Sequence, residues 1–186
     1  MYCKPYLLSV FRITAFLCLL WGGERAVFAA GREDGRYFSF GSTNSLKGVG
    51  FCADLGHDPL TFSSLAFTAD LIDILDGKAS APGLKFTYHY NMIWKSCADG
   101  KLDFYAGPGL TGGHVRNIDN YFGFMGGVSF DGGVRYSCSG RPVTLCLELQ
   151  ADISLIFKNK YNPAMSLYRA GFRQSYYPHL KIQYVF

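Results

Sequence analysis

The chain has 186 residues, with 18 Lys and Arg against 14 Asp and Glu, which gives a net charge of +4. This length fits one domain, and a charge so close to neutral gives no electrostatic basis for binding nucleic acid. Glycine and aromatic residues are abundant, proline is scarce, and the six cysteines include no CxxC pair that would mark a zinc or redox motif.

The first 29 residues have the layout of a secretory signal peptide. A basic start precedes an apolar core from Ile13 to Trp21, and small residues end the segment, so cleavage is expected after Ala29 or Ala30. A membrane anchor is the alternative, but this core is shorter than the roughly 20 residues that a spanning helix needs. The sequence therefore predicts a signal peptide over residues 1–29 and one domain over residues 30–186.

Three short segments follow in which apolar and polar residues alternate. A period of two is typical of a β-strand with one apolar and one polar face. Phe38 and Phe40 mark the first strand, the second runs from Val49 to Leu55, and the third runs from Leu65 to Leu71.

Four longer segments carry the same alternation more strongly. Their apolar positions, such as Leu84, Phe86 and Tyr88, are separated by glycine, small polar residues and charges. Each segment is long enough to cross a bilayer as a tilted strand. The predicted strands are Gly83–Trp94, Lys101–His114, Phe122–Ser137 and Val143–Phe157.

The C-terminal segment completes a set of eight strands. Its apolar positions end on the final aromatic residue, and polar residues such as His179 and Lys181 stand between them. This ending is typical of the closing strand of a bacterial outer-membrane β-barrel. The predicted assembly signal consists of Leu180, Ile182, Tyr184 and Phe186.

Alternation alone does not say which face points inward, and a soluble barrel or sandwich would bury the apolar face. Three observations favour a membrane barrel. The polar face consists of Gly, Ser, Thr and charged residues, which suits a narrow interior, and the apolar ladders are long enough to cross a bilayer. Aromatic residues also gather near the strand ends, where they would form an interfacial girdle. The predicted fold is therefore an all-β, eight-stranded antiparallel transmembrane β-barrel. The expected girdle residues are Phe62, Trp94, Phe104, Tyr136, Tyr184 and Phe186.

The connections fall into two kinds. The segments Gly56–Pro59, Lys95–Gly100 and Cys138–Pro142 are short and polar, as periplasmic turns would be. The other three are longer and are expected to face outward, where aromatic residues could contact a partner. These loops are Asp76–Pro82, His114–Asn120 and Lys158–Tyr177, and the loop aromatics are Tyr161, Tyr168, Tyr176 and Tyr177.

The polar faces would fill the interior of the barrel with charged side chains. Eight strands leave an interior just wide enough for side chains, so charges there must pair or bind water. We expect a structural plug, with Arg135, Lys85 and Lys181 paired to carboxylates; a small water or proton path is the alternative. The predicted interior network is Asp54, Asp70, Lys85, His89, Asp103, Asp131, Arg135, Glu148, Asp152 and Lys181.

Catalysis would need a nucleophile, a base and an orienting acid within reach of one another. The candidates are His114 and Asp119 near an outer rim, Ser129 and Asp131 on the neighbouring strand, and His89 in the interior, but no short motif links them. The histidines lack the spacing of metal ligands, so we expect no metal, no cofactor and no enzymatic activity.

The segments Gly107–Gly109 and Gly112–Gly113 sit in a strand pattern that no helix follows, so they are not predicted to bind phosphate. They are expected either to let the strands bend or to let bulky interior neighbours pass. Cys97 and Cys138 fall in neighbouring turns, where a disulfide is an option, although free thiols are the expectation.

Three segments resemble small outer-membrane β-barrel proteins of Bacteroides-type bacteria, with a scaffold like that of OmpA, OmpX and OmpW. They are Pro82–Tyr88, Asp103–Gly109 and Tyr177–Phe186. The resemblance implies an outer-membrane location, and it transfers no catalytic or binding residue.

We therefore expect an integral outer-membrane β-barrel with a structural or surface-interaction role.

 A narrow, porin-like channel for small solutes is the alternative function, and an outer-membrane acyl-transfer or lipid-modifying enzyme is a minor one. The expected partners are outer-membrane lipid, the barrel-assembly machinery and an extracellular ligand at the long loops. Nucleic acid is not expected, and the chain is expected to act as a monomer.

A first prediction concerns assembly. The mature chain should fractionate with the outer membrane and migrate as a heat-modifiable band, because folded barrels resist detergent until heated. Deleting Phe186, or replacing Tyr184 with Asp, should impair membrane assembly, since both positions lie on the lipid-facing side of the closing strand. Recovery as a soluble periplasmic protein would contradict the membrane barrel, and unchanged insertion of the variants would contradict this orientation.

Overall fold

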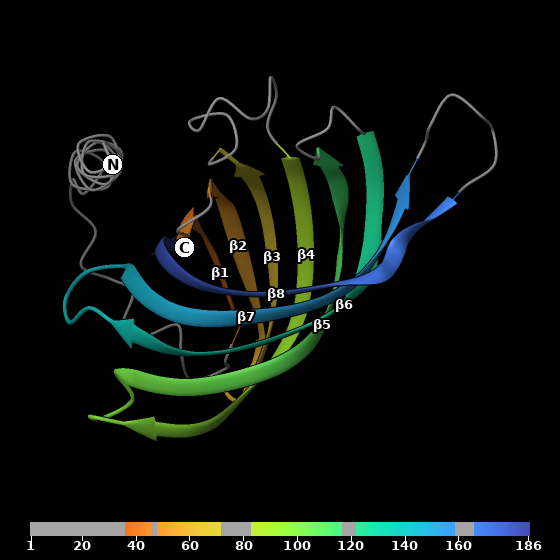
Figure 1. Cartoon of the computed structure of the whole chain (residues 1–186). Helices are drawn as coiled ribbons and strands as arrows, with labels where there is room; N and C mark the ends of the chain where they lie inside the picture. Colours follow the sequence, from red (N-terminus) through yellow and green to blue (C-terminus); the bar gives the residue numbers. More distant parts are fainter. Residues whose placement is uncertain (1–35, 46–47, 72–82, 117–121, 159–165) are drawn as a thin grey trace, which may run out of the picture.

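The computed structural model describes residues 36–45, 48–71, 83–116, 122–158 and 166–186, and these residues form eight antiparallel strands. Each strand pairs with the next along the chain, and β1 also pairs with β8, which closes the barrel (Figure 1). The eight strands and the closed antiparallel barrel expected from the sequence are confirmed. The strands are β1 (Tyr37–Ser45), β2 (Gly48–Asp58), β3 (Thr61–Asp70), β4 (Gly83–Cys97), β5 (Leu102–Arg116), β6 (Phe122–Ser137), β7 (Val143–Lys158) and β8 (Ser166–Val185).

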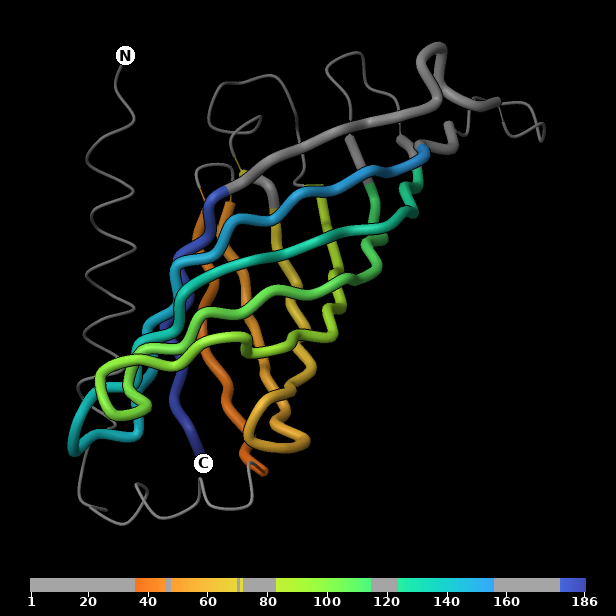
Figure 2. Tube along the Cα trace, turned by 90° about the horizontal axis from the view of Figure 1, so that it is seen from below, coloured from red at the N-terminus to blue at the C-terminus, as the bar shows by residue number. Residues whose placement is uncertain are grey.

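The two end strands close the barrel through a continuous antiparallel ladder. It runs from the pair Ser39 and Val185 to the pair Ser45 and His179. Beyond the ladder, the Phe186 amide donates a hydrogen bond of 2.8 Å to the carbonyl of Phe38. Figure 2 shows the C-terminus at the same end of the barrel as the short β2–β3, β4–β5 and β6–β7 turns.

Side chains alternate between an apolar outer face and a polar interior. Outward residues such as Trp94 and Leu147 are 68% and 62% exposed, whereas Asp131 in the interior is 0% exposed. This distribution is the reverse of that in a water-soluble barrel, in which apolar side chains fill the core. In the predicted assembly signal, Phe186 is 57% exposed and Ile182 is 7% exposed.

Strand β8 is longer than the sequence predicted. The segment Lys158–Tyr177 was expected to be a loop, but β8 already begins at Ser166. The stretch before His179 lacks clean alternation and contains Pro178, so the apolar pattern gives no strand signal there. It is nevertheless paired with β7, because ladder hydrogen bonds join backbone groups whatever the side-chain pattern.

This longer strand corrects the assignment of the loop aromatics. Tyr168, Tyr176 and Tyr177 belong to β8 rather than to a loop. Tyr161 and the loop Asp76–Pro82 lie outside the described residues, as does most of His114–Asn120. The predicted signal peptide over residues 1–29 also lies outside them.

Two turns contain fewer residues than predicted, because the strands before them continue past β-bulges. Strand β4 extends to Cys97 past an irregularity between Ile93 and Lys95, and β2 extends to Asp58 past one between Gly56 and Asp58.

The described residues contain no helix that is long and apolar enough to span a membrane.

Phe62 was expected in the outer aromatic girdle, and this prediction is wrong. The side chain is 1% exposed and points into the barrel. Its position has the same parity as Ser64, which also points inward. The apolar character of Phe62 suggested the outer face, but the strict alternation of side chains along β3 decides its direction.

Two glycines of β5 let larger side chains of β4 cross above them inside the barrel. Gly109 pairs with His89 on β4 and with Ser129 on β6. A Cβ atom at Gly109 would collide with the His89 ring and with the Tyr88 carbonyl. A Cβ atom at Gly107 would similarly collide with the Asn91 side chain. The two glycines therefore provide the space in which β4 side chains reach β6.

We expect Gly109→Ala to destabilise the barrel, because overpacking of this kind costs about 1–3 kcal/mol. Gly126→Ala is the matched control, since a Cβ atom at Gly126 would meet no atom within 4 Å. The measurement is the unfolding midpoint in detergent, followed by the shift of the heat-modifiable band. Equal midpoints for the two variants would contradict the crowding at Gly109.

Candidate functional site in the barrel interior

The barrel interior gathers most of the described ionisable side chains of the chain. All the predicted network residues whose side chains are described point inward, and all but Lys85 are buried. The side chain of Asp70 is outside the described part of the structure. The buried members are Asp54, His89, Asp103, Asp131, Arg135, Glu148, Asp152 and Lys181.

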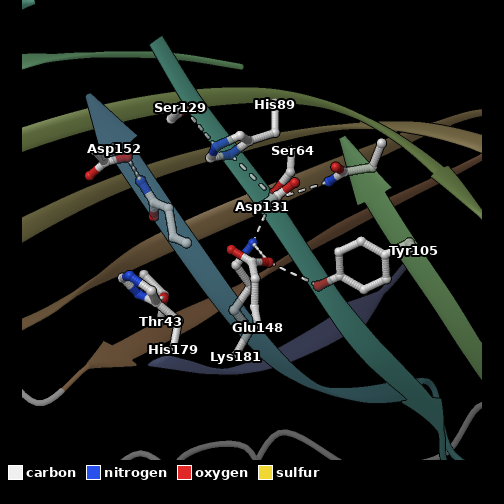
Figure 3. Close-up of polar contacts among 12 residues, drawn as sticks. Thr43, Ser64, His89, Tyr105, Ser129, Asp131, Glu148, Asp152, His179 and Lys181 are labelled. Atoms are coloured by element: carbon white, nitrogen blue, oxygen red, sulfur yellow. Dashed lines mark hydrogen bonds and ion pairs between the residues drawn. The ribbon is translucent and has the colours of Figure 1, made fainter. Parts of the chain in front are cut away.

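Glu148 on β7 is the centre of one group of contacts. Its carboxylate lies 2.6 Å from Nζ of Lys181 on β8 and accepts a hydrogen bond of 2.9 Å from the hydroxyl of Tyr105 on β5 (Figure 3). Lys181 also donates to Oγ of Ser64 on β3, at 3.0 Å. The group therefore joins four strands across the interior. Because every member is buried, this ion pair is not weakened by water as a surface pair would be.

Arg135 on β6 forms a second group nearer the short turns. Its guanidinium lies 3.2 Å from Asp103 on β5 and donates a hydrogen bond to the hydroxyl of Tyr37 on β1. The guanidinium carbon lies 4.6 Å from the ring centre of Phe62, a distance typical of cation–π contacts. Phe62 in turn packs edge-on against the Tyr105 ring, with centroids 5.1 Å apart. Phe62 thus fills the interior beside a cation.

His89 on β4 links two residues of β6. Its Nε2 atom lies 2.7 Å from Oγ of Ser129, and its Nδ1 atom lies 3.4 Å from Oδ2 of Asp131 (Figure 3). Asn91 donates to the same Asp131 oxygen, at 3.3 Å. The bridge passes over Gly109, whose missing side chain leaves room for the imidazole ring.

The order of these contacts is that of a Ser–His–Asp catalytic triad, but their setting differs. Ser129, His89 and Asp131 are 6%, 2% and 0% exposed, so an ester substrate has no room beside the hydroxyl. The neighbouring backbone amides belong to strand ladders and are not gathered into an oxyanion hole. The arrangement therefore serves to connect β4 with β6. Of the other catalytic candidates, His114 packs against the Phe124 ring on the wall, and Asp119 is outside the described residues.

Lys85 and Asp152 make the remaining ion pair of the network. The Nζ atom of Lys85 on β4 lies 2.8 Å from Oδ2 of Asp152 on β7. Gln150 donates a hydrogen bond of 2.7 Å to the other oxygen of the same carboxylate. The Lys85 side chain keeps 17% exposure, the largest among these ion-paired side chains.

Within the described part of the chain, the interior carries more carboxylates than lysine and arginine side chains. Asp54, Asp103, Asp131, Glu148 and Asp152 face Lys85, Arg135 and Lys181. Oδ1 of Asp54 and Oδ1 of Asp131 are buried atoms without a hydrogen-bond partner among the described residues. Polar atoms of this kind usually bind water, so the interior has the chemistry to hold water between its ion pairs.

Several interior residues were missed at the level of the sequence. Tyr37 binds Arg135 and Asn91 binds Asp131 inside the barrel. Both residues lie at inward-facing positions of strands that the sequence had predicted at least in part. Alternation put Asn91 on the polar face of its predicted strand, but neither residue type suggested charge pairing, so both were left out of the predicted network. Cys97 and Cys138 are free thiols, as expected, and Cys52 and Cys146 are free and buried. No group of three His, Cys, Asp or Glu side chains in the described ranges is placed to hold a metal ion.

Fold and site together define a class: a closed, eight-stranded antiparallel β-barrel with an apolar exterior and an ion-paired interior. The fold is similar to the N-terminal β-barrel domain of OprF from Pseudomonas aeruginosa. The TM-score is 0.56 and the sequences are 10% identical, and the match covers 82% of this chain and 98% of that one. The sequence matches no protein-family model and no curated protein. At this level of identity the likeness concerns the fold alone.

We expect Arg135→Ala to lower the stability of the barrel by about 3–5 kcal/mol, because it leaves the buried Asp103 carboxylate without its cation. Lys95→Ala is the control, since Lys95 is exposed on β4. The unfolding midpoint in detergent should fall clearly for the first variant and hardly at all for the second. Small, equal effects would show that water screens the interior charges.

Proposed function

We propose that the chain is an integral outer-membrane β-barrel with a structural or surface-interaction role and a packed polar interior. The observation that carries this proposal is the reversed polarity of the barrel wall. Large apolar side chains such as Phe51, Phe124 and Leu147 are 62%, 65% and 62% exposed, while ionised groups are buried inside. Water would oppose both arrangements, whereas hydrocarbon outside the wall favours them.

The closed ladder supports membrane placement as well. Hydrocarbon offers no hydrogen-bond partners, so a sheet can cross it only when no edge is left unpaired. Pairing of β1 with β8 meets this requirement. An expected export signal over residues 1–29 and the alternating apolar positions of β8 fit delivery to an outer membrane by barrel-assembly machinery.

The interior contacts favour a structural role over transport. The Glu148 and Arg135 groups tie strands together across the barrel, and aromatic rings fill space beside them. Side chains held in this way occupy the volume that a solute would need. The outer loops remain the proposed place for an extracellular ligand, and the barrel is proposed to act as a monomer.

A narrow channel is the second candidate, and one observation favours it. Buried oxygen atoms of Asp54, Asn91 and Asp131 have no hydrogen-bond partner among the described residues, which suits water inside the barrel. A chain of such waters past the ion pairs would pass protons or small ions.

Planar-bilayer recording of the refolded protein separates the two roles. We expect no steady conductance from the native chain, because paired side chains fill the interior. Lys85→Gln removes the most accessible cation of the network and should also leave the bilayer closed. Steady conductance that changes in Lys85→Gln or Asp131→Asn would instead support the channel.

A further inference from the structure

A small polar cluster lies on the outside of the barrel, near the β2–β3 turn. Nε2 of His57 lies 2.7 Å from Oγ of Ser63, and the same oxygen lies 3.1 Å from the hydroxyl of Tyr88. His57 is exposed, and Ser63 and Tyr88 are half-buried. The interior network uses none of these three side chains, which we call the outer Ser–His cluster.

A β-bulge orients the histidine of this cluster. The pairing of β2 with β3 shifts between Gly56 and Asp58, so His57 is the extra residue of β2. Bulges redirect side chains, and here the imidazole lies along the outer wall toward β4. It stacks on the ring of Tyr90, with ring centroids 6.0 Å apart. The stacking and the hydrogen bond to Ser63 together fix the direction of the imidazole.

A carboxylate follows the histidine of this cluster in the chain. Asp58 is fully exposed in the turn, where the Thr61 hydroxyl and the Leu60 amide donate to it and hold the pKa of its carboxyl below the ordinary value. Asp58 is therefore ionised at neutral pH and places a negative charge next to His57.

The surroundings of the cluster are those of a lipid boundary. Leu55, Leu65 and Met92 are 50%, 42% and 57% exposed on the same side of the wall. Asp58, at the end of β2, places an exposed carboxylate beside this apolar surface. In a bilayer, ester carbonyls of glycerolipids lie at such a boundary between hydrocarbon and headgroups. An acyl chain could lie along the apolar residues with its ester carbonyl beside Ser63.

We propose that Ser63 is a nucleophile, activated by His57, that accepts an acyl group from a glycerolipid ester. Ser63 Oγ would bond to the ester carbonyl carbon while its proton passes to His57 Nε2. The ester C–O bond would then break, and His57 would return the proton to the departing alcohol oxygen. Water would release the acyl group as a fatty acid, with His57 taking and returning the proton again. The Tyr88 hydroxyl is placed to donate to the developing oxyanion.

Accessibility distinguishes this cluster from the buried Ser129 group. Both serines lie 2.7 Å from an imidazole nitrogen, but His57 is exposed whereas His89 is 2% exposed. A lipid ester can reach only the outer cluster. This inference rests on the proposed placement in a membrane and adds a lipid ester as its substrate class.

The test is labelling of the folded protein in detergent with an alkyl fluorophosphonate, followed by mass spectrometry of its peptides. We expect the label on Ser63, its loss in Ser63→Ala, and a rate about 100-fold lower in His57→Gln. Ser42→Ala is the matched control and should label as the native chain does, because Ser42 is a serine of β1 whose described partner is Asn44 and not a histidine.

Three results would overturn the proposal: no labelling, equal labelling of Ser42 and Ser63, or labelling confined to Ser129. A second measurement, release of fatty acid from phospholipid vesicles that contain the protein, should fall to background in Ser63→Ala. Absence of release by the native chain would also overturn it. Heat-modifiable migration, measured on every variant, separates loss of chemistry from loss of folding. Failure of labelling would leave fractionation and conductance, which test the proposed function, unaffected.

Discussion

The structure depends on one constraint, which is that charges enclosed by a narrow barrel must find partners there. Eight strands leave room for side chains and little else, so a carboxylate in the interior cannot keep a full shell of water. Glu148 meets this constraint with Lys181 and Tyr105, and Asp103 meets it with Arg135. The ion pairs lie on neighbouring strands, and the hydrogen bonds of Glu148 to Tyr105 and of Arg135 to Tyr37 reach strands that are not neighbours. The cost of burying charge is therefore offset by contacts that hold the barrel together.

The wall of the barrel must be shaped to allow these pairs. His89 reaches Ser129 and Asp131 only because Gly109, on the strand between them, has no side chain. Gly107 likewise leaves space for the Asn91 side chain. Glycine normally weakens a strand, and here that cost accompanies a gain in contact between β4 and β6. The polar contacts of the interior therefore depend on the glycines of β5.

The outer face of the barrel is mainly apolar, and a small polar cluster is the exception. Apolar side chains dominate it, yet His57, Ser63 and Tyr88 form hydrogen bonds with one another at its boundary. The bulge at His57 makes this possible, because regular pairing would not provide the extra residue. Two serine–histidine contacts of equal length thus occur, one outside the barrel and one inside it, and only the outer contact is accessible to solvent and lipid.

The sequence by itself determined the number of strands, the antiparallel order and the two faces of each strand, because side chains on a strand alternate with a period of two and short turns join neighbours. The same alternation puts Asp131, Glu148 and Lys181 on the polar face. It failed where residue type was used in place of parity, as at Phe62, and where no alternation exists, as in the first part of β8.

Only the tertiary structure decided which side chains meet. The partners of Arg135, for example, come from β1, β3 and β5, and their approach depends on the stagger of the strands as the barrel closes. The bulge that turns His57 toward Ser63 has no signature in residue order, because the two residues lie on separate strands and only the pairing register places them together. Strand faces are a local property of the chain, whereas contacts across a barrel depend on its closure.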